Sequence, residues 1–78
     1  MSNDLAKELI LWRETVGINQ EHAARLFGVS SGGYRHWEAR RRKPPATVGR
    51  ILSVYRMLAI MAPKILGGII NDAKEPRE

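Results

Sequence analysis

Two short helical segments separated by three residues constrain this chain more than any other feature. Gly28-Val29-Ser30 lies between them, and glycine takes a positive φ without steric cost, so the chain can turn sharply at this point. Asn19 and Ser30 are predicted to cap the two helices, because Asn and Ser side chains accept hydrogen bonds from the free N–H groups of a first turn. The stretch 20–38 therefore predicts two helices packed across a tight turn.

Apolar residues recur at helical spacing along the rest of the chain as well. Steps of three and four residues place them on one face of a helix, whereas no stretch alternates apolar and polar residues as a strand does. Pro44-Pro45 ends the third helix, because proline lacks an N–H and restricts the residue before it. We therefore expect an all-α fold, a compact bundle of about five helices over residues 4–16, 20–27, 31–39, 46–61 and 63–71.

The two ends of the chain carry weaker signals. Asn3 is a candidate N-cap for the first helix, and the polar segment 72–78 is predicted to fray. Because 78 residues suffice for only one small domain, we expect a single domain over 1–71 followed by a polar tail.

The chain is small and contains no cysteine. A domain of this size buries only about 60% of its unfolded surface, and no disulfide or thiolate metal site can add stability. Either the packing is unusually good or a second copy of the chain supplies further buried surface. Neither a signal peptide nor an apolar run of the roughly 18 residues that span a membrane is apparent. We expect a cytoplasmic protein that does not enter a membrane.

Basic residues outnumber acidic ones, 13 to 8, which gives a net charge of +5 and a pI of about 10.3. Such a charge favours an acidic partner, which could be nucleic acid, an anionic membrane or an acidic protein. The cations are densest in 35–43. Arg40, Arg41, Arg42 and Lys43 form a short basic run, which by itself is more often a solvated surface than a binding site. Its position directly after the second of the two short helices favours contact with a nucleic-acid backbone, which confers affinity rather than sequence choice.

This pattern resembles the Cro/CI (Xre-type) helix-turn-helix domain of phage repressors and many small bacterial regulators. The resemblance covers residues 9–45, about half of the chain. It implies a lambda-repressor-like bundle whose third helix enters the major groove of DNA. The matching residues are Leu9, Trp12, Arg13, Gly17, Gln20, Ala24, Gly28, Val29, Ser30, Tyr34, Trp37 and Glu38, followed by a proline after a basic stretch.

The resemblance also implies which residues contact DNA. Base contacts are expected from Ser31, Gly32 and His36. Arg35, on the exposed side of the same helix, could read guanine bidentately or hold a phosphate. Contacts to the DNA backbone are expected from Asn19, Gln20, Ser30, Arg40, Arg41, Arg42 and Lys43.

Two further pairs of residues are expected to be structural. The family pairs the residues at the positions of Arg13 and Glu38 in a partly buried ion pair, and a lone charge at such a site is costly. Trp12 and Trp37 lie on apolar stripes and are interpreted as core residues rather than platforms for bases.

The remaining arginines outside the basic run are less informative. Arg25 and Arg56 are expected to be solvated. Arg50, near the start of the fourth helix, could equally contact a phosphate or be solvated.

The chain departs from the family in its reading helix. Arg40 stands where the family often has glycine, so the third helix could extend into the arginine run. Gly32-Gly33 replaces residues that usually read bases or hold the helix, and each glycine costs about 1 kcal/mol relative to alanine. Either the bare helix start approaches DNA closely, or a loose turn orders on binding. In both cases base reading shifts towards Arg35 and His36.

A second apolar stripe is present near the end of the chain. Val54, Met57 and Met61 lie three and four residues apart, on a different face from the core stripe, and the last helix adds Ile65 and Ile69. The last helix could fold back over this stripe, or the stripe could form a twofold homodimer contact. We favour the homodimer.

These observations together predict a transcription regulator, a dimeric (auto)repressor that binds double-stranded DNA at an inverted-repeat operator. One alternative is an antitoxin-type module that binds a toxin or another protein and contacts DNA secondarily. The other is a non-specific nucleic-acid binder. An enzyme is not expected, because no activated nucleophile, carboxylate pair or phosphate-binding loop is apparent. No cofactor is expected, and two histidines without cysteine make a metal site improbable.

Overall fold

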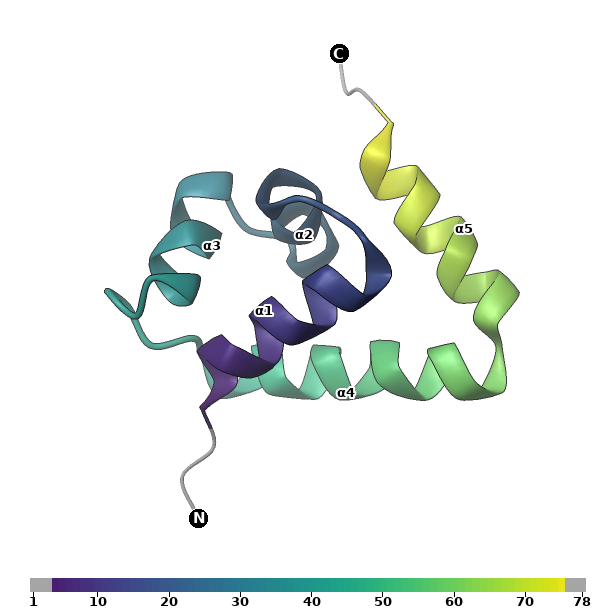
Figure 1. The fold of residues 1–78 in the computed structure, drawn as a ribbon, viewed down its shortest axis with the longest axis horizontal. Coiled ribbons are helices and arrows are strands. Elements are labelled where there is room, and N and C mark those ends of the chain that lie inside the picture. Colours follow the sequence, from purple (N-terminus) through teal and green to yellow (C-terminus); the bar gives the residue numbers. More distant parts are fainter. Residues whose placement is uncertain (1–3, 76–78) are drawn as a thin grey trace.

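The computed structural model of the chain describes residues 4–75 and contains five α-helices within them (Figure 1). The prediction of an all-α bundle is confirmed. The principal extents of the molecule are 33 × 32 × 19 Å, so it is about two helices thick. No helix in this part of the chain is both long and apolar enough to cross a membrane. The helices are α1 (Leu5–Val16), α2 (Gln20–Phe27), α3 (Ser31–Glu38), α4 (Ala46–Met61) and α5 (Pro63–Lys74).

Local capping sets the ends of α2 and α3. Asn19 Oδ1 accepts a hydrogen bond from the N–H of His22 at 2.8 Å, and Ser30 Oγ accepts one from the N–H of Gly33 at 3.0 Å. Gly28 ends α2 with a φ of 71°, in the left-handed region that glycine takes without strain. Three residues thus join α2 to α3, the connection length typical of a helix-turn-helix.

The N-cap of α1 is Asp4, whose Oδ1 accepts a hydrogen bond from the N–H of Lys7 at 3.2 Å. Asn3, the cap predicted from the sequence, lies outside the described residues. At the other end of α1, Gly17 has a φ of 75° and ends the helix as predicted.

An aromatic cluster forms the centre of the fold. Trp12 of α1 stacks on Tyr55 of α4 with ring centroids 5.5 Å apart, and it meets Phe27 of α2 edge-on at 5.8 Å. Tyr34 and Trp37 of α3 continue the cluster, with 6.0 Å between their ring centroids. Trp12 and Trp37 are only 6% and 7% exposed, so both are core residues as predicted.

The last helix, α5, packs against the helix-turn-helix segment through α2. In Figure 1, α4 lies along the lower edge, α1 runs above it, and α2 and α3 lie above α1. α5 turns back sharply after α4 and packs against both α2 and α4. Leu66 and Ala73 are the buried residues of α5.

The C-terminal end of α5 differs from the prediction. The helix continues to Lys74 instead of ending at about residue 71, because Ala73 is 4% exposed and belongs to the core. Arg25 was expected to be solvated, and this expectation is wrong. Its Nη1 donates to the carbonyl oxygens of Ala73 at 2.9 Å and Glu75 at 3.0 Å. These carbonyls belong to a helix terminus that lacks internal donors, so a cation is favourable there.

α3 ends at Glu38 and does not extend into the arginine run, so the predicted extension is wrong. Arg40 adopts a left-handed conformation with a φ of 62°. Its N–H bonds to the carbonyl of Trp37, and the N–H of Arg41 bonds to the carbonyl of His36, which together form a Schellman motif. Glycine is favoured at this position, because the left-handed conformation costs a residue with a Cβ about 1–2 kcal/mol.

Candidate nucleic-acid interface

The exposed face of α3 forms a shallow hollow. It has a volume of about 320 Å³ and is lined by Gly32, Arg35, His36, Ala39 and Arg41. The opposite face of α3 is anchored in the core by its two aromatic residues. The helix is therefore fixed from behind, and its polar side chains point outward over one continuous surface.

Three of the four residues predicted to contact bases share this hollow. Arg35 and His36 are exposed, and Gly32 lies one turn before His36. Ser31 is half-buried and does not line the hollow. Nothing in the chain lies within 4 Å of the point where a Cβ at Gly32 would be, so no internal contact requires glycine at this position.

Two of the residues predicted to touch the DNA backbone also hold local structure. Asn19 and Ser30 are exposed, and each uses one side-chain oxygen to cap a helix. Gln20 is half-buried and donates from Nε2 to Glu38 Oε1 at 2.8 Å, so its amide links the start of α2 to the end of α3.

The ion pair expected between Arg13 and Glu38 is present and is bidentate. Arg13 Nε donates to Glu38 Oε2 at 2.7 Å, and Arg13 Nη2 donates to Glu38 Oε1 at 3.1 Å. Arg13 Nη1 also donates to the carbonyl of Ile18 at 3.1 Å. The two charged side chains are 18% and 6% exposed, which makes the pair a partly buried link between α1 and α3.

The hydrogen bonds of this pair shift the pKa of both groups. The hydrogen bond to Glu38 raises the pKa of Arg13 above its ordinary value. Burial by itself would raise the pKa of Glu38, but the hydrogen bonds from Arg13 and Gln20 outweigh burial and lower it. Glu38 is therefore held in its ionised form at the C-terminal end of the candidate reading helix.

The basic run divides into one paired and three unpaired cations. Arg40 Nη2 contacts Asp4 Oδ2 at 2.5 Å, and the two side chains are 52% and 47% exposed. Arg41, Arg42 and Lys43 are exposed, and none has a carboxylate partner within the described residues. Arg41 lines the hollow on α3, and the other two cations follow it directly in the chain.

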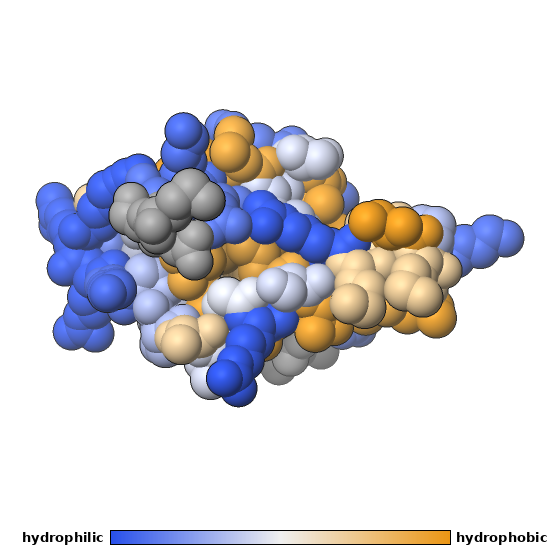
Figure 2. All heavy atoms as spheres, turned by 90° about the horizontal axis from the view of Figure 1, so that it is seen from below, coloured by the Kyte–Doolittle hydropathy of each residue, from blue (hydrophilic) through white to orange (hydrophobic). Residues whose placement is uncertain are grey.

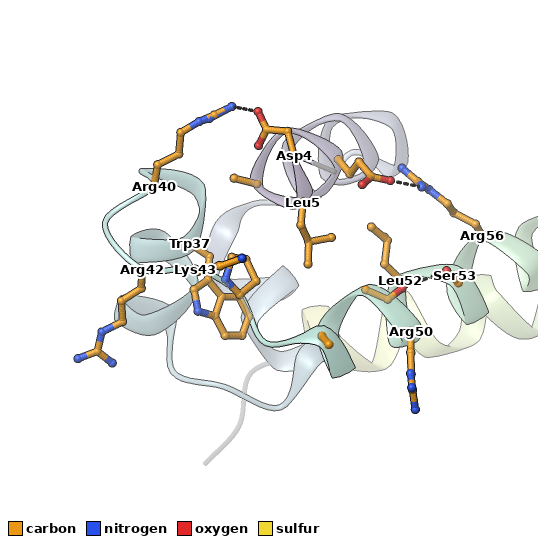
Figure 3. Close-up of a pocket in the computed structure, with 15 residues that line it drawn as sticks. Asp4, Leu5, Trp37, Arg40, Arg42, Lys43, Arg50, Leu52, Ser53 and Arg56 are labelled. Carbon is orange, nitrogen blue, oxygen red and sulfur yellow. Dashed lines mark hydrogen bonds and ion pairs between the residues drawn. The ribbon is translucent and has the colours of Figure 1, made fainter. Parts of the chain in front are cut away.

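A larger groove runs beside the basic run, between the start of α1, the α3–α4 connection and α4 (Figure 3). Its volume is about 770 Å³. Leu5, Trp37 and Leu52 contribute apolar lining, while Arg42 and Arg50 point away from α1 in Figure 3.

At the far end of this groove, Arg56 Nη1 pairs with Glu8 Oε1 at 2.9 Å. Arg56 is exposed, as expected, but its ion pair with Glu8 was not predicted. The two groups are 45% and 38% exposed, so water screens the pair strongly. The pairing depends on the packing of α1 against α4, for which residues 48 positions apart give no local signal.

An apolar surface lies at the end of α4 and the start of α5. Val54, Met57, Met61 and Ile65 are 53%, 59%, 76% and 60% exposed, and Ile60, which sequence reasoning missed, is 84% exposed. Its position three residues after Met57 was the available signal. In Figure 2 apolar residues are concentrated towards the right of the view and hydrophilic residues towards the left, while some hydrophilic side chains also project at the right.

Ile69 differs from the rest of the predicted dimer contact. It is half-buried and packs against the core with its neighbour Ile70. We call the five exposed residues Val54, Met57, Ile60, Met61 and Ile65 the apolar face, and Ile69 lies outside it.

No group of three or more His, Asp or Glu side chains is placed to hold a metal within residues 4–75. Comparisons of the chain with models of known protein families, with curated proteins and with solved structures found no match.

Proposed function

We propose that this chain is a sequence-specific DNA-binding regulator that acts as a homodimer. The observation that carries the proposal is the exposed face of α3, where Arg35 and His36 share a hollow with Arg41, and the unpaired cations Arg42 and Lys43 follow in the chain. Base-reading donors beside a strip of backbone-binding cations are the combination that sequence-specific binding needs.

α3 is suited to the major groove, because its exposed face carries polar side chains and its other face is fixed in the core. Arg35 can donate two hydrogen bonds to guanine, and His36 can donate to or accept from a base edge. Gly32 places bare backbone at the start of the helix, where a close approach to DNA is sterically free.

The basic run supplies affinity without sequence choice. Arg41, Arg42 and Lys43 neutralise phosphates and release counterions, so binding weakens steeply as salt rises. The network of Arg13, Gln20 and Glu38 fixes the end of α3 relative to α1 and α2, and so determines where these cations lie relative to the reading face.

The apolar face supports the dimer. Five large apolar side chains that are at least half exposed recur at helical spacing between residues 54 and 65 of α4 and α5, and large patches of this kind mark interaction sites on small proteins. A twofold axis through this face would present two α3 helices to an inverted repeat, with half-sites about 34 Å apart. Such a dimer would repress by occupying a promoter and excluding polymerase.

A binding titration tests the proposal. The affinity for duplex DNA from upstream of the chain's own gene is compared with that for a random duplex of the same length, at a fixed salt concentration. We expect at least about a thousandfold preference for the upstream site. Equal affinity for both duplexes would show that the chain binds nucleic acid non-specifically, and this result would contradict the proposal.

Two variants separate base reading from backbone contact. Arg35→Ala should reduce discrimination between related sites by about 1–3 kcal/mol at one base position. Arg42→Ala should weaken binding to all duplexes alike. It should also reduce, by about 1, the slope of the logarithm of the binding constant against the logarithm of the salt concentration. Lys64→Ala is the control, because Lys64 is an exposed cation at the start of α5, away from the basic run.

The second candidate is a protein-interaction module of the antitoxin type, which the same apolar face favours. In that case the apolar face would bind a toxin or another protein, and DNA binding would be secondary. A stable one-to-one complex with a different protein, formed through the apolar face with loss of the homodimer, would favour this candidate.

A further inference from the structure

Arg40 combines two unusual features. It is the one residue other than glycine with a positive φ in the described part of the chain, at 62°. It is also the one cation of the basic run that has a carboxylate partner among residues 4–75, namely Asp4 of α1. One arginine thus combines a backbone conformation that favours glycine with an ion pair to another helix.

Asp4 uses its two carboxylate oxygens differently. Oδ1 accepts the N–H of Lys7 and caps α1, while Oδ2 accepts Nη2 of Arg40. Figure 3 shows Arg40 reaching from the end of α3 across to Asp4, whereas Arg42 points the other way. The N-cap of α1 does not depend on Arg40, because the capping hydrogen bond and the ion pair use different oxygens of the Asp4 carboxylate.

The ion pair does not explain why position 40 is an arginine. The Arg40 and Asp4 side chains are 52% and 47% exposed, and exposed pairs contribute little because water screens them and both side chains lose freedom. The left-handed conformation costs at least as much as such a pair contributes. Glycine would make the same turn without strain. Contacts within the described residues therefore do not explain an arginine at this position.

We propose that Asp4 competes with DNA for Arg40. Its carboxylate holds the guanidinium in the free protein, and a phosphate of the DNA backbone replaces it in the complex. This inference rests on the proposed DNA binding. Arg41, Arg42 and Lys43 meet the DNA without giving up a partner, whereas Arg40 must first release Asp4.

Asp4 consequently lowers the affinity of the chain for DNA and flattens its dependence on salt. Because salt weakens an exposed ion pair, the cost of releasing Asp4 falls as the ionic strength rises. The exchange is feasible because the pair is weak.

Replacing Asp4 by asparagine isolates this effect. Asn caps helices about as well as Asp, so Asp4→Asn keeps α1 and removes the charge. We expect it to bind duplex DNA up to about fivefold more tightly at low salt, with the difference shrinking as salt rises. Glu14→Gln is the matched control: Glu14 is an exposed residue of α1 without an ion pair among the described residues, so it changes the net charge equally.

A double-mutant cycle completes the test. In an Arg40→Gln background, Asp4→Asn should gain no more affinity than Glu14→Gln does. The exchange is wrong if Asp4→Asn gains as much affinity for duplex DNA in the Arg40→Gln background as in the wild type. It is also wrong if Asp4→Asn never gains more affinity than Glu14→Gln does. In both cases the proposed DNA binding still stands. If the wild-type chain binds no duplex, the proposed function fails and the exchange fails with it. A thermal unfolding curve for each variant verifies that α1 remains folded.

Discussion

At the scale of single residues, the carboxylate of Glu38 accepts three side-chain hydrogen bonds. It accepts two hydrogen bonds from Arg13 and one from Gln20, so one side chain joins the ends of three helices. Because the Glu38 side chain is only 6% exposed, removal of its cation would leave a nearly buried charge that only the hydrogen bond from Gln20 compensates.

Arg13→Met tests this link. The methionine keeps apolar bulk but removes the guanidinium, so we expect the free energy of unfolding to fall by about 3 kcal/mol in urea denaturation. Arg56→Met is the control, because its pair with Glu8 is exposed and should contribute less than about 1 kcal/mol. Equal losses in the two variants would show that the Arg13–Glu38 pair has no special structural role.

The same group predicts a dependence of stability on pH. The folded-state pKa of Glu38 lies below its value of 4.5 in the unfolded chain, so the unfolded state binds a proton more readily. The stabilisation is fully present above the unfolded pKa and is lost as the pH falls through the folded pKa. Melting temperatures measured from about pH 6 to pH 3 should fall less steeply for Glu38→Gln than for the wild type.

At the scale of elements, α3 has a helix start that packing within the chain does not explain. A Cβ at Gly32 would meet nothing within 4 Å, while one at Gly33 would lie 3.1 Å from Ser30 Oγ, the oxygen that caps the helix. α3 is nevertheless helical from Ser31 onward. No contact within the described residues therefore requires glycine at position 32, and under the proposed function its role would be to let α3 approach DNA closely.

Gly32→Ala is expected to stabilise the fold and weaken DNA binding. Alanine favours the helix by about 0.5–1 kcal/mol, and urea denaturation would measure this gain. A new methyl group on the reading face would obstruct a close approach to DNA, so the affinity for the operator should fall. Tighter binding by this variant would instead support a helix start that orders on contact with DNA.

The second element-scale prediction concerns α5 and the apolar face. A charge at Ile65 would have to be desolvated in a dimer, so Ile65→Glu should shift the chain from dimer to monomer in sedimentation experiments at micromolar concentration. Asn71→Glu adds the same charge at another exposed position of α5 and should leave the dimer intact. A wild-type chain that is already monomeric and binds the operator equally well would refute the dimer.

At the scale of the whole molecule, signals within one turn of the chain were readable from the sequence. Asn19, Gly28 and Ser30 revealed their roles because capping depends on neighbouring backbone groups. The distant Arg13–Glu38 pair was expected only from the resemblance to a known family. The partners of Arg25 and Arg40 were missed because they lie 48 and 36 residues away, and only the packed fold brings them together.

The outward face of α3 was predictable for a related reason. It follows from the inward positions of the two aromatic residues, so helical spacing places Arg35 and His36 on the exposed side. Their contact with DNA bases stays a prediction. The division of the basic run into paired and unpaired cations could not be predicted in this way, because Asp4 approaches Arg40 only after α1 has packed against α3.

In Figure 2 hydrophilic residues are concentrated towards one end of the molecule and apolar residues towards the other. The proposed function places α3 and the basic run against DNA and joins two copies through the apolar face, so two copies would bind two half-sites. A footprint on the DNA upstream of the chain's own gene tests this claim most directly. The account predicts protection of an inverted repeat whose half-site centres lie about 34 Å apart, or 10–10.5 base pairs. Protection that is uniform along the DNA, or confined to a single half-site at saturating protein, would contradict it.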